Sequence, residues 1–281
     1  MKRITFIFLL LVTNFAMAQN LRIITYNIRL NIASDGINAW PNRADQVSAL
    51  LDFHQAEIFG LQEAMIEQIE DIQAALPKMK WVGVGRDDGA KAGEFSPVFY
   101  DAEKFKALKN GGFWLSETPE KPGLGWDAAC NRVCTWIVLK EIKTGDKFMV
   151  FNTHFDHVGN KARTESAKLI LQKIKELNTD KLPIILMGDF NLTPDKEPIA
   201  LITAELNDSR AITKKPPYGP VGTTNEFKYT HPLKDRIDYV FVSDQVEVKR
   251  YGVLTDSKDQ RFPSDHQPVL VVLELKDGKK K

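Results

Sequence analysis

The sequence has few cysteines, no excess of charge of one sign and no apolar run long enough to cross a membrane. Only two cysteines, Cys130 and Cys134, occur among 281 residues. Lys and Arg together number 38 and Asp and Glu number 37, which gives a formal net charge of +1. Proteins that coat nucleic acid normally show a strong basic excess. The charge balance therefore argues against that class, although it leaves room for an enzyme with a locally basic cleft.

The spacing of the two cysteines argues against a disulfide bond. Residues 132–141 have the alternation and the β-branched and aromatic content of a strand. An extended chain would hold the Cα atoms of Cys130 and Cys134 about 13 Å apart, whereas a disulfide needs them within about 7 Å. We therefore expect two free thiols. A zinc site built on them would need partner ligands that the sequence does not supply.

The apolar run at the N-terminus has the pattern of an export signal. Met1-Lys2-Arg3 is positively charged, residues 4–15 are almost wholly apolar, and Ala16-Met17-Ala18 has the small residues that signal peptidase reads. The run is too short for a membrane span, which needs about 20 residues. We predict a signal peptide over residues 1–18, cleavage after Ala18, and a periplasmic or secreted protein without a stable membrane span. A buried N-terminal strand or an uncleaved anchor is the alternative.

Residues 19–281 alternate between short apolar strands and amphipathic helices, and their length suits one large α/β domain or two small ones. Helices are predicted over residues 43–53, 65–76 and 161–177, and strands over residues 21–26, 57–61, 80–85, 95–100, 132–141, 147–154, 183–187, 236–243, 246–254 and 267–275. Because the order of elements is mixed, we expect mixed β-sheets layered between helices.

Polar residues of catalytic type stand at the ends of these predicted strands. They are Asn27, Glu63, His154, Asp189 with Asn191, Asp238, and Asp265 with His266. Enzymes of the α/β class place their sites where strand ends project polar groups toward one rim. Each residue also has a purely structural interpretation, as a carboxylate near a helix N-terminus or as a side-chain-capped turn. The set as a whole, more than any single member, predicts an active site.

The ligand types in this set indicate a hard divalent cation. Glu63 and Asp265 offer the oxygen ligands that suit Mg²⁺ or Mn²⁺. Mg²⁺ takes few protein ligands and completes its shell with water and substrate phosphate, so a sparse set of carboxylates and amides fits phosphoryl chemistry. His154 and His157 lack a convincing third ligand for zinc. Contact between an imidazole and a phosphate oxygen is the better interpretation of His154.

Taken in order, the motifs resemble those of the endonuclease/exonuclease/phosphatase superfamily, which includes DNase I, apurinic endonucleases, neutral sphingomyelinases and inositol polyphosphate 5-phosphatases. The matching segments are Thr25-Tyr26-Asn27-Ile28, Gly60-Leu61-Gln62-Glu63, Asn152-Thr153-His154, Gly188-Asp189-Phe190-Asn191, Arg236-Ile237-Asp238-Tyr239 and Ser264-Asp265-His266. They span essentially all of residues 19–281, the predicted catalytic domain. The pattern is also similar to the carbon-catabolite-repressor type deadenylases and their bacterial relatives.

The resemblance implies a fold and a metal site. The fold would be a four-layer α/β/β/α sandwich of two packed mixed β-sheets flanked by helices, with the site at one edge. Glu63 would be the principal metal ligand, helped by Asn27 and Asp265. The expected cofactor is Mg²⁺, with Mn²⁺ as the alternative.

The resemblance also implies catalytic roles at two of the turns. Asp189 would orient or deprotonate the attacking water, and Asn191 would lie beside it and contact the phosphate. His266, polarised by Asp265, would act as general acid/base or stabilise the pentavalent transition state.

Four further residues would complete the site by resemblance. His154 would bind the scissile phosphate, and Glu94 would pair with His154. Asp238 would support the site, and Arg132 would contact the phosphate. A guanidinium is well suited to grip a phosphate through two parallel hydrogen bonds, which also makes Arg163 a candidate, although a solvated helix face explains Arg163 equally well.

These expectations define a function and its alternatives. We predict a monomeric, Mg²⁺-dependent phosphoesterase that hydrolyses a small phosphoester or lipid headgroup outside the cytoplasm by in-line attack of an activated water. The lack of a basic excess favours a small substrate over long duplex DNA. A periplasmic or secreted nuclease acting on DNA or RNA is the alternative. A non-catalytic binding module should have lost some of the metal or acid/base residues, and all of them are present.

Overall fold

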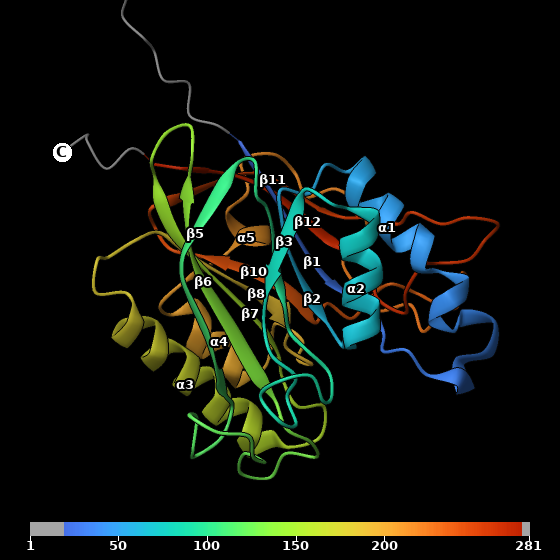
Figure 1. The fold of residues 1–281 in the computed structure, drawn as a ribbon, viewed down its shortest axis with the longest axis horizontal. Coiled ribbons are helices and arrows are strands. Elements are labelled where there is room, and N and C mark those ends of the chain that lie inside the picture. Colours follow the sequence, from blue (N-terminus) through green and yellow to red (C-terminus); the bar gives the residue numbers. More distant parts are fainter. Residues whose placement is uncertain (1–19, 277–281) are drawn as a thin grey trace, which may run out of the picture.

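Two six-stranded β-sheets pack face to face between two layers of helices (Figure 1). The computed structural model describes residues 20–276. The four-layer α/β/β/α sandwich implied by the resemblance is confirmed. The predicted signal peptide, residues 1–18, lies outside the described residues and stays a prediction. None of the helices between residues 20 and 276 is long and apolar enough to span a membrane.

The first sheet has the strand order β11-β12-β1-β2-β4-β3. Its strands are β1 (Leu21–Asn27), β2 (Ile58–Gln62), β3 (Met79–Val82), β4 (Val98–Asp101), β11 (Val246–Val253) and β12 (Val269–Leu275). Strands β1 and β2 are parallel, with Asn27 beside Gln62 at their carboxyl ends. The neighbouring pairs are antiparallel.

The second sheet has the order β5-β6-β7-β8-β10-β9. Its strands are β5 (Phe105–Trp114), β6 (Val133–Glu141), β7 (Lys147–His154), β8 (Ile184–Asp189), β9 (Asn207–Asp208) and β10 (Asp238–Val242). Strands β7 and β8 are parallel and place His154 beside Asp189, while the other pairs are antiparallel. Both sheets are therefore mixed, as predicted, and each carries one parallel pair that ends in polar residues.

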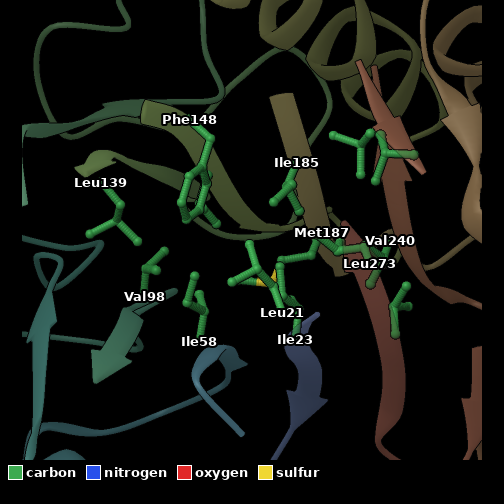
Figure 2. Close-up of a cluster of buried hydrophobic side chains, with 14 of the residues drawn as sticks. Leu21, Ile23, Ile58, Val98, Leu139, Phe148, Ile185, Met187, Val240 and Leu273 are labelled. Carbon is green, nitrogen blue, oxygen red and sulfur yellow. The ribbon is translucent and has the colours of Figure 1, made fainter. Parts of the chain in front are cut away.

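The main core lies between the two sheets (Figure 2). Leu21, Ile23 and Ile58 from the first sheet belong to the same buried cluster as Ile185 and Met187 from the second. Burial of such side chains stabilises the fold by about 25 cal/mol per Å² of apolar surface. The alternation of residues along each strand determines which side chains enter this layer.

The helices cover the outer faces of the sheets (Figure 1). Helices α1 (Ala44–Phe53) and α2 (Ile66–Ala75) pack their apolar faces on the first sheet. Helices α3 (Asn160–Leu177) and α4 (Glu197–Thr203) pack on the second. The three predicted helices are confirmed, with ends within one residue of those expected. The shorter elements are α5 (Ser209–Ile212) and the 3-10 helices η1 (Ala33–Asn38) and η2 (Trp40–Asn42).

Strand β5 was not predicted, and its sequence explains why. It is the edge strand of the second sheet, with exposed lysines and a register shift between Ala107 and Lys109. Gly111 lies in its interior, where a Cβ would stand 3.0 Å from the ring of Trp136. A strand that combines glycine, lysine and a bulge lacks the alternation on which sequence patterns depend.

Candidate active site

The ends of the parallel strand pairs bring most of the predicted site residues together. Asn27 ends β1 and Glu63 follows β2, while His154 ends β7 and Asp189 ends β8. The antiparallel strand β10 begins at Asp238, directly opposite Asp189. The turn between β11 and β12 adds Asp265 and His266. Two sheets thus contribute to one rim, because their parallel pairs end at the same edge of the sandwich.

Asp189 is at the centre of the site. Its Oδ2 accepts a hydrogen bond from Asn27 Nδ2 at 3.0 Å and lies 3.5 Å from His154 Nε2 and 3.8 Å from His266 Nε2. Burial and the charge of Asp238 raise the pKa of Asp189 from 3.8 to about 7, against the opposing effects of His266 and the hydrogen bond from Asn27. A general base is most effective when its pKa lies near the working pH. Asp189 therefore has the environment of a catalytic base.

His266 is paired with Asp238. Its Nδ1 lies 2.9 Å from Asp238 Oδ2. Burial lowers the pKa of His266, but the charge and hydrogen bond of Asp238, together with the charge of Asp189, outweigh that effect and raise the pKa well above its usual value. The imidazole is therefore held as a cation with Nε2 directed toward Asp189. Asp265 also raises the pKa of His266, but less than Asp238 does, because the register of β10 places Asp238 against the ring nitrogen.

Glu63 and Asp265 form the acidic side of the site. Burial raises the pKa of Asp265 and the charge of Glu63 raises it further, although His266 opposes this. Glu63 also adopts a positive φ of 58°. That conformation is uncommon for a residue with a long side chain and tends to persist at functional sites. Two neighbouring carboxylates whose charges repel are suited to a divalent cation, so these residues fit the predicted metal.

Asn27 holds the carboxylates of Glu63 and Asp189 in place. Its Nδ2 donates to Glu63 Oε1 at 3.1 Å as well as to Asp189, and its Oδ1 accepts the backbone N–H of Arg29 at 3.0 Å. The amide therefore presents its donor, not its oxygen, to the two carboxylates. Asn27 positions them in this arrangement, and its role as a metal ligand stays a prediction.

Two clusters of potential ligands among residues 20–276 have donor atoms within 4.8 Å of one another, and Glu63 is in neither. One contains Asp189, Asp238 and His266, but a protonated imidazole bound to Asp238 has no lone pair for a metal. The other contains Cys130, Asp156 and His157. There the guanidinium of Arg132 lies 3.2 Å from His157 Nδ1 and 3.8 Å from Asp156 Oδ2, so its charge opposes a second cation.

The thiols behave as expected. Cys130 and Cys134 are both free. Burial raises the pKa of the Cys134 thiol well above its usual value, and burial also raises that of Cys130. Both residues are therefore protonated and poor nucleophiles.

His154 is neutral and oriented by Asn191. Asn191 Nδ2 donates to the carbonyl oxygen of Phe155 at 2.9 Å, which identifies it as the amide nitrogen, and lies 3.0 Å from His154 Nε2. His154 Nε2 therefore accepts, and Nδ1 carries the proton. Burial lowers the pKa of His154 well below its usual value, and the charge of Arg132 adds to that effect. His154 is thus suited to donate a hydrogen bond, not to act as a strong acid.

Glu94 is held by an arginine that the sequence did not single out. Arg86 Nη1 lies 2.6 Å from Glu94 Oε2, whereas the same oxygen lies 4.0 Å from His154 Nδ1. Glu94 therefore lies next to His154, as expected, but too far for a direct hydrogen bond, and its catalytic role stays a prediction. The only signal for Arg86 was its place at the start of the polar loop of residues 86–93. That loop folds back so that the Arg86 N–H donates to the Glu94 carbonyl.

Arg132 lines the same small cavity as His154, and its predicted contact with the phosphate stays a prediction. It is 5% exposed, and neither Nε nor Nη1 has a hydrogen-bond partner within the described part of the chain. Buried guanidinium donors that are free in this way favour an anionic or hydroxyl ligand. Arg163 donates to the carbonyl of His157 and to Asn160 Oδ1 on the surface of α3, so its interactions are those of a helix face.

Comparisons with known proteins agree with this geometry. The model of the endonuclease/exonuclease/phosphatase family matches residues 24–266. A Bacteroides thetaiotaomicron protein of that family has a solved structure with a TM-score of 0.88 and 40% identity, covering 92% of this chain and 99% of that one. The mannosyl-6-phosphatase of Bacteroides thetaiotaomicron VPI-5482 gives a TM-score of 0.86 and 41% identity, covering 90% and 99%.

A more distant relative belongs to the deadenylase branch. The 3′-5′-exoribonuclease subunit Ccr4 of the CCR4-Not complex from Aspergillus niger is 22% identical over 86% of this chain. The matched region is 48% of that relative, so this chain spans about half of its length.

Proposed function

Because the chain belongs to the endonuclease/exonuclease/phosphatase family, we propose that it is a phosphatase that uses Mg²⁺ to hydrolyse small phosphate monoesters. Members of this family are metal-dependent phosphoesterases, and the chain is an enzyme of that type. The Mg²⁺ ion, the small substrate and the place of action are the parts that we propose. The observation that carries the proposal is the arrangement of the predicted site residues around Asp189.

Each residue of the site has its own part in the proposed reaction. Asp189 accepts a proton from the attacking water, since its pKa of about 7 lets it hold one transiently. His266 donates a proton from Nε2 to the leaving oxygen, while Asp238 holds Nδ1 of the same ring. The proton that Asp189 has gained then returns to His266, whose Nε2 lies 3.8 Å from Asp189 Oδ2. The phosphate would lie beside Asp189 and Asn191, on the Nε2 side of His154. A cation held by Glu63 and Asp265 would neutralise charge on the phosphate.

Two observations favour a small substrate. The balance of 38 basic and 37 acidic residues supplies no general attraction for a polyanion. The relative at 41% identity is a mannosyl-6-phosphatase, which supports a phosphorylated sugar as the substrate class. Nuclease activity is the second candidate, supported by the more distant exoribonuclease relative. We further propose that the enzyme acts in the periplasm or outside the cell, from the export pattern of residues 1–18.

The test is a substrate panel with purified protein. Hydrolysis of p-nitrophenyl phosphate and mannose 6-phosphate would be compared with that of bis-p-nitrophenyl phosphate, poly(A) and plasmid DNA, with Mg²⁺ and with EDTA. We expect the two monoesters to be the better substrates and EDTA to abolish turnover. Faster cleavage of poly(A) or plasmid than of either monoester would overturn the phosphatase proposal in favour of a nuclease.

The same assay tests the catalytic residues. Asp189→Asn and His266→Ala should leave the fold intact and each lower kcat by about 10²–10⁴-fold, which is the range for loss of general acid–base catalysis. Circular dichroism verifies folding. A variant that keeps more than a few per cent of wild-type turnover would refute the role of that residue.

A further inference from the structure

A small cavity lies behind the catalytic imidazole of His154. Arg86, Glu94, Ser96, Arg132 and His154 line it, and its volume of about 10 Å³ holds one water-sized group. The cavity is on the Nδ1 side of the ring, whereas the Nε2 side faces Asn191 and Asp189. A ligand atom in this cavity would therefore be separated from Asp189 by the imidazole itself.

One carboxylate oxygen of Glu94 lies at the same distance from two nitrogen atoms that line the cavity. Glu94 Oε2 lies 4.0 Å from His154 Nδ1 and 4.0 Å from Arg132 Nη1. Both distances are too long for a hydrogen bond. Yet both nitrogens are buried and have no hydrogen-bond partner anywhere in residues 20–276. Since a buried donor without a partner is destabilising, an oxygen atom between these groups is strongly favoured.

The chemistry of the lining selects the kind of oxygen. His154 Nδ1 and Arg132 Nη1 are donors, so the oxygen must accept from them. Glu94 Oε2 is an acceptor and is fixed by Arg86 Nη1 at 2.6 Å, so the oxygen must also donate. A hydroxyl group has one proton to donate and two lone pairs, which matches this set. A phosphate or carboxylate oxygen would instead meet the negative charge of Glu94.

The position of the cavity relates this hydroxyl to the substrate. A phosphate beside Asp189 and Asn191 and a hydroxyl at His154 Nδ1 would lie on two sides of one imidazole ring. The width of the ring and one close contact on each side would separate them by about 5–7 Å. That separation is within the reach of one small molecule. In a hexose 6-phosphate, the hydroxyl on C4 is the one nearest to the phosphate.

We infer that the cavity binds a hydroxyl group of the leaving alcohol, so that Glu94, Arg132 and His154 select phosphate esters of polyols such as sugars. The inference deepens the proposed function and rests on it. Arg86 is a positioning residue in this arrangement, because it touches Glu94 and holds the carboxylate away from His154. Without Arg86, Glu94 would be free to pair with the imidazole and close the gap.

The test combines substrate and enzyme variants. Values of kcat/KM would be measured for mannose 6-phosphate and its 2-, 3- and 4-deoxy analogues with wild-type enzyme and with Glu94→Gln. We expect the wild type to lose about tenfold to a thousandfold on one analogue, with the 4-deoxy compound as the first candidate. Glu94→Gln should discriminate less than about threefold between that analogue and the parent. The quantity compared is the ratio of kcat/KM for the parent substrate to kcat/KM for the analogue. A general effect of the variant on turnover therefore cancels.

Control variants separate this effect from general damage. Glu70 is an exposed carboxylate 3.8 Å from Lys91 of the same polar loop, so Glu70→Gln should keep the wild-type discrimination. If Glu94→Gln is inactive or unfolded, Arg86→Lys provides the same comparison, since it keeps the charge but not the guanidinium fork. We expect discrimination to fall in Arg86→Lys as well, and unchanged discrimination in either variant would overturn the inference.

The remaining outcomes distinguish the inference from the proposed function. If the wild type turns over mannose 6-phosphate with Mg²⁺ but loses less than about twofold on every deoxy analogue, the cavity holds only water and the inference fails. Failure to hydrolyse any monoester would instead overturn the proposed function.

Discussion

At the scale of single residues, three aspartates with the same side chain have three different tasks. Asp189 is buried beside another acid and has a raised pKa. Asp238 is hydrogen-bonded to His266 and keeps it protonated. Asp265 faces Glu63 on the acidic side. Their environments, more than their chemistry, assign these tasks, because burial and neighbouring charges decide which form of each group is stable.

Removal of the Asp238 charge should move both limbs of the pH–rate profile in the same direction. In Asp238→Asn the pKa of His266 falls, since Asp238 is the largest influence that raises it, so activity is lost at a lower pH on the alkaline side. The pKa of Asp189 falls as well, so activity appears at a lower pH on the acidic side. We also expect kcat to drop about 10²–10⁴-fold. A profile in which only one limb moves would contradict the shared role of Asp238.

At the scale of secondary-structure elements, Asn152 links the two sheets. It lies in β7, and its Nδ2 donates to the carbonyls of Leu61 and Pro97, each at 2.8 Å, while its Oδ1 accepts from Gln62 Nε2 at 2.7 Å. A Cβ on Gly60 would lie 2.6 Å from Asn152 Cγ, so glycine is required there for the amide to fit. Gly60, Gln62 and Asn152 therefore have structural roles in the motifs Gly60-Leu61-Gln62-Glu63 and Asn152-Thr153-His154. They hold together the strand ends that carry the site.

Loss of this link should destabilise the protein. Asn152→Ala removes three buried hydrogen bonds between the sheets, and we expect the free energy of unfolding to fall by about 2–5 kcal/mol. Urea denaturation would measure the change, with an unchanged m-value as evidence that the transition remains two-state. Asn110 is an exposed asparagine in strand β5, so Asn110→Ala should change stability by less than about 0.5 kcal/mol.

The N-terminus of α3 gives a pH-dependent prediction. Asp127 Oδ1 accepts the N–H of Ala162 at 2.6 Å and Oδ2 accepts that of Lys161 at 3.2 Å. The Ala162 hydrogen bond lowers the pKa of Asp127 below its ordinary value of 3.8. A carboxylate with a depressed pKa stabilises the fold above its unfolded pKa and loses that effect as the pH falls through the folded pKa. Asp127→Asn should therefore lower the melting temperature more at pH 6 than at pH 2.

At the scale of the whole molecule, the sandwich makes one site from two sheets. Figure 1 shows the sheets packed between α1 and α2 on one side and α3 and α4 on the other. Glu63 comes from the first sheet and Asp189 from the second. The site therefore exists only when the core between the sheets is complete, and a ligand that bridges both sheets should stabilise the whole fold.

Metal binding should accordingly raise thermal stability. A cation that binds only the folded state at 100 times its Kd adds about 2.7 kcal/mol to the free energy of unfolding. We expect Mg²⁺ to raise the melting temperature of the wild type and to have little effect on Glu63→Gln. Glu70→Gln, which removes an exposed carboxylate that pairs with Lys91, should respond as the wild type does. An equal shift in Glu63→Gln would refute the assignment of the metal to Glu63.

The sequence by itself determined the elements and the chemical inventory. Apolar alternation in residues 147–154 and 183–187 predicted the buried strands, and the polar residues directly after them predicted a site at the strand ends. The free state of Cys130 and Cys134 followed from spacing alone. These features are local, so a pattern over a few residues specifies them. The edge strand β5 has no such pattern, and its pairing with β6 decides its conformation.

Only the tertiary structure decided the partners. The assignment of His266 to Asp238 depends on the register between β8 and β10, and the separation of Glu94 from His154 depends on the fold of a loop that brings Arg86 to Glu94. Hydrogen-bond partners are set by differences of about an ångström between groups far apart in the chain. Residue types and spacing carry no information at that precision, whereas the packing of two sheets fixes it.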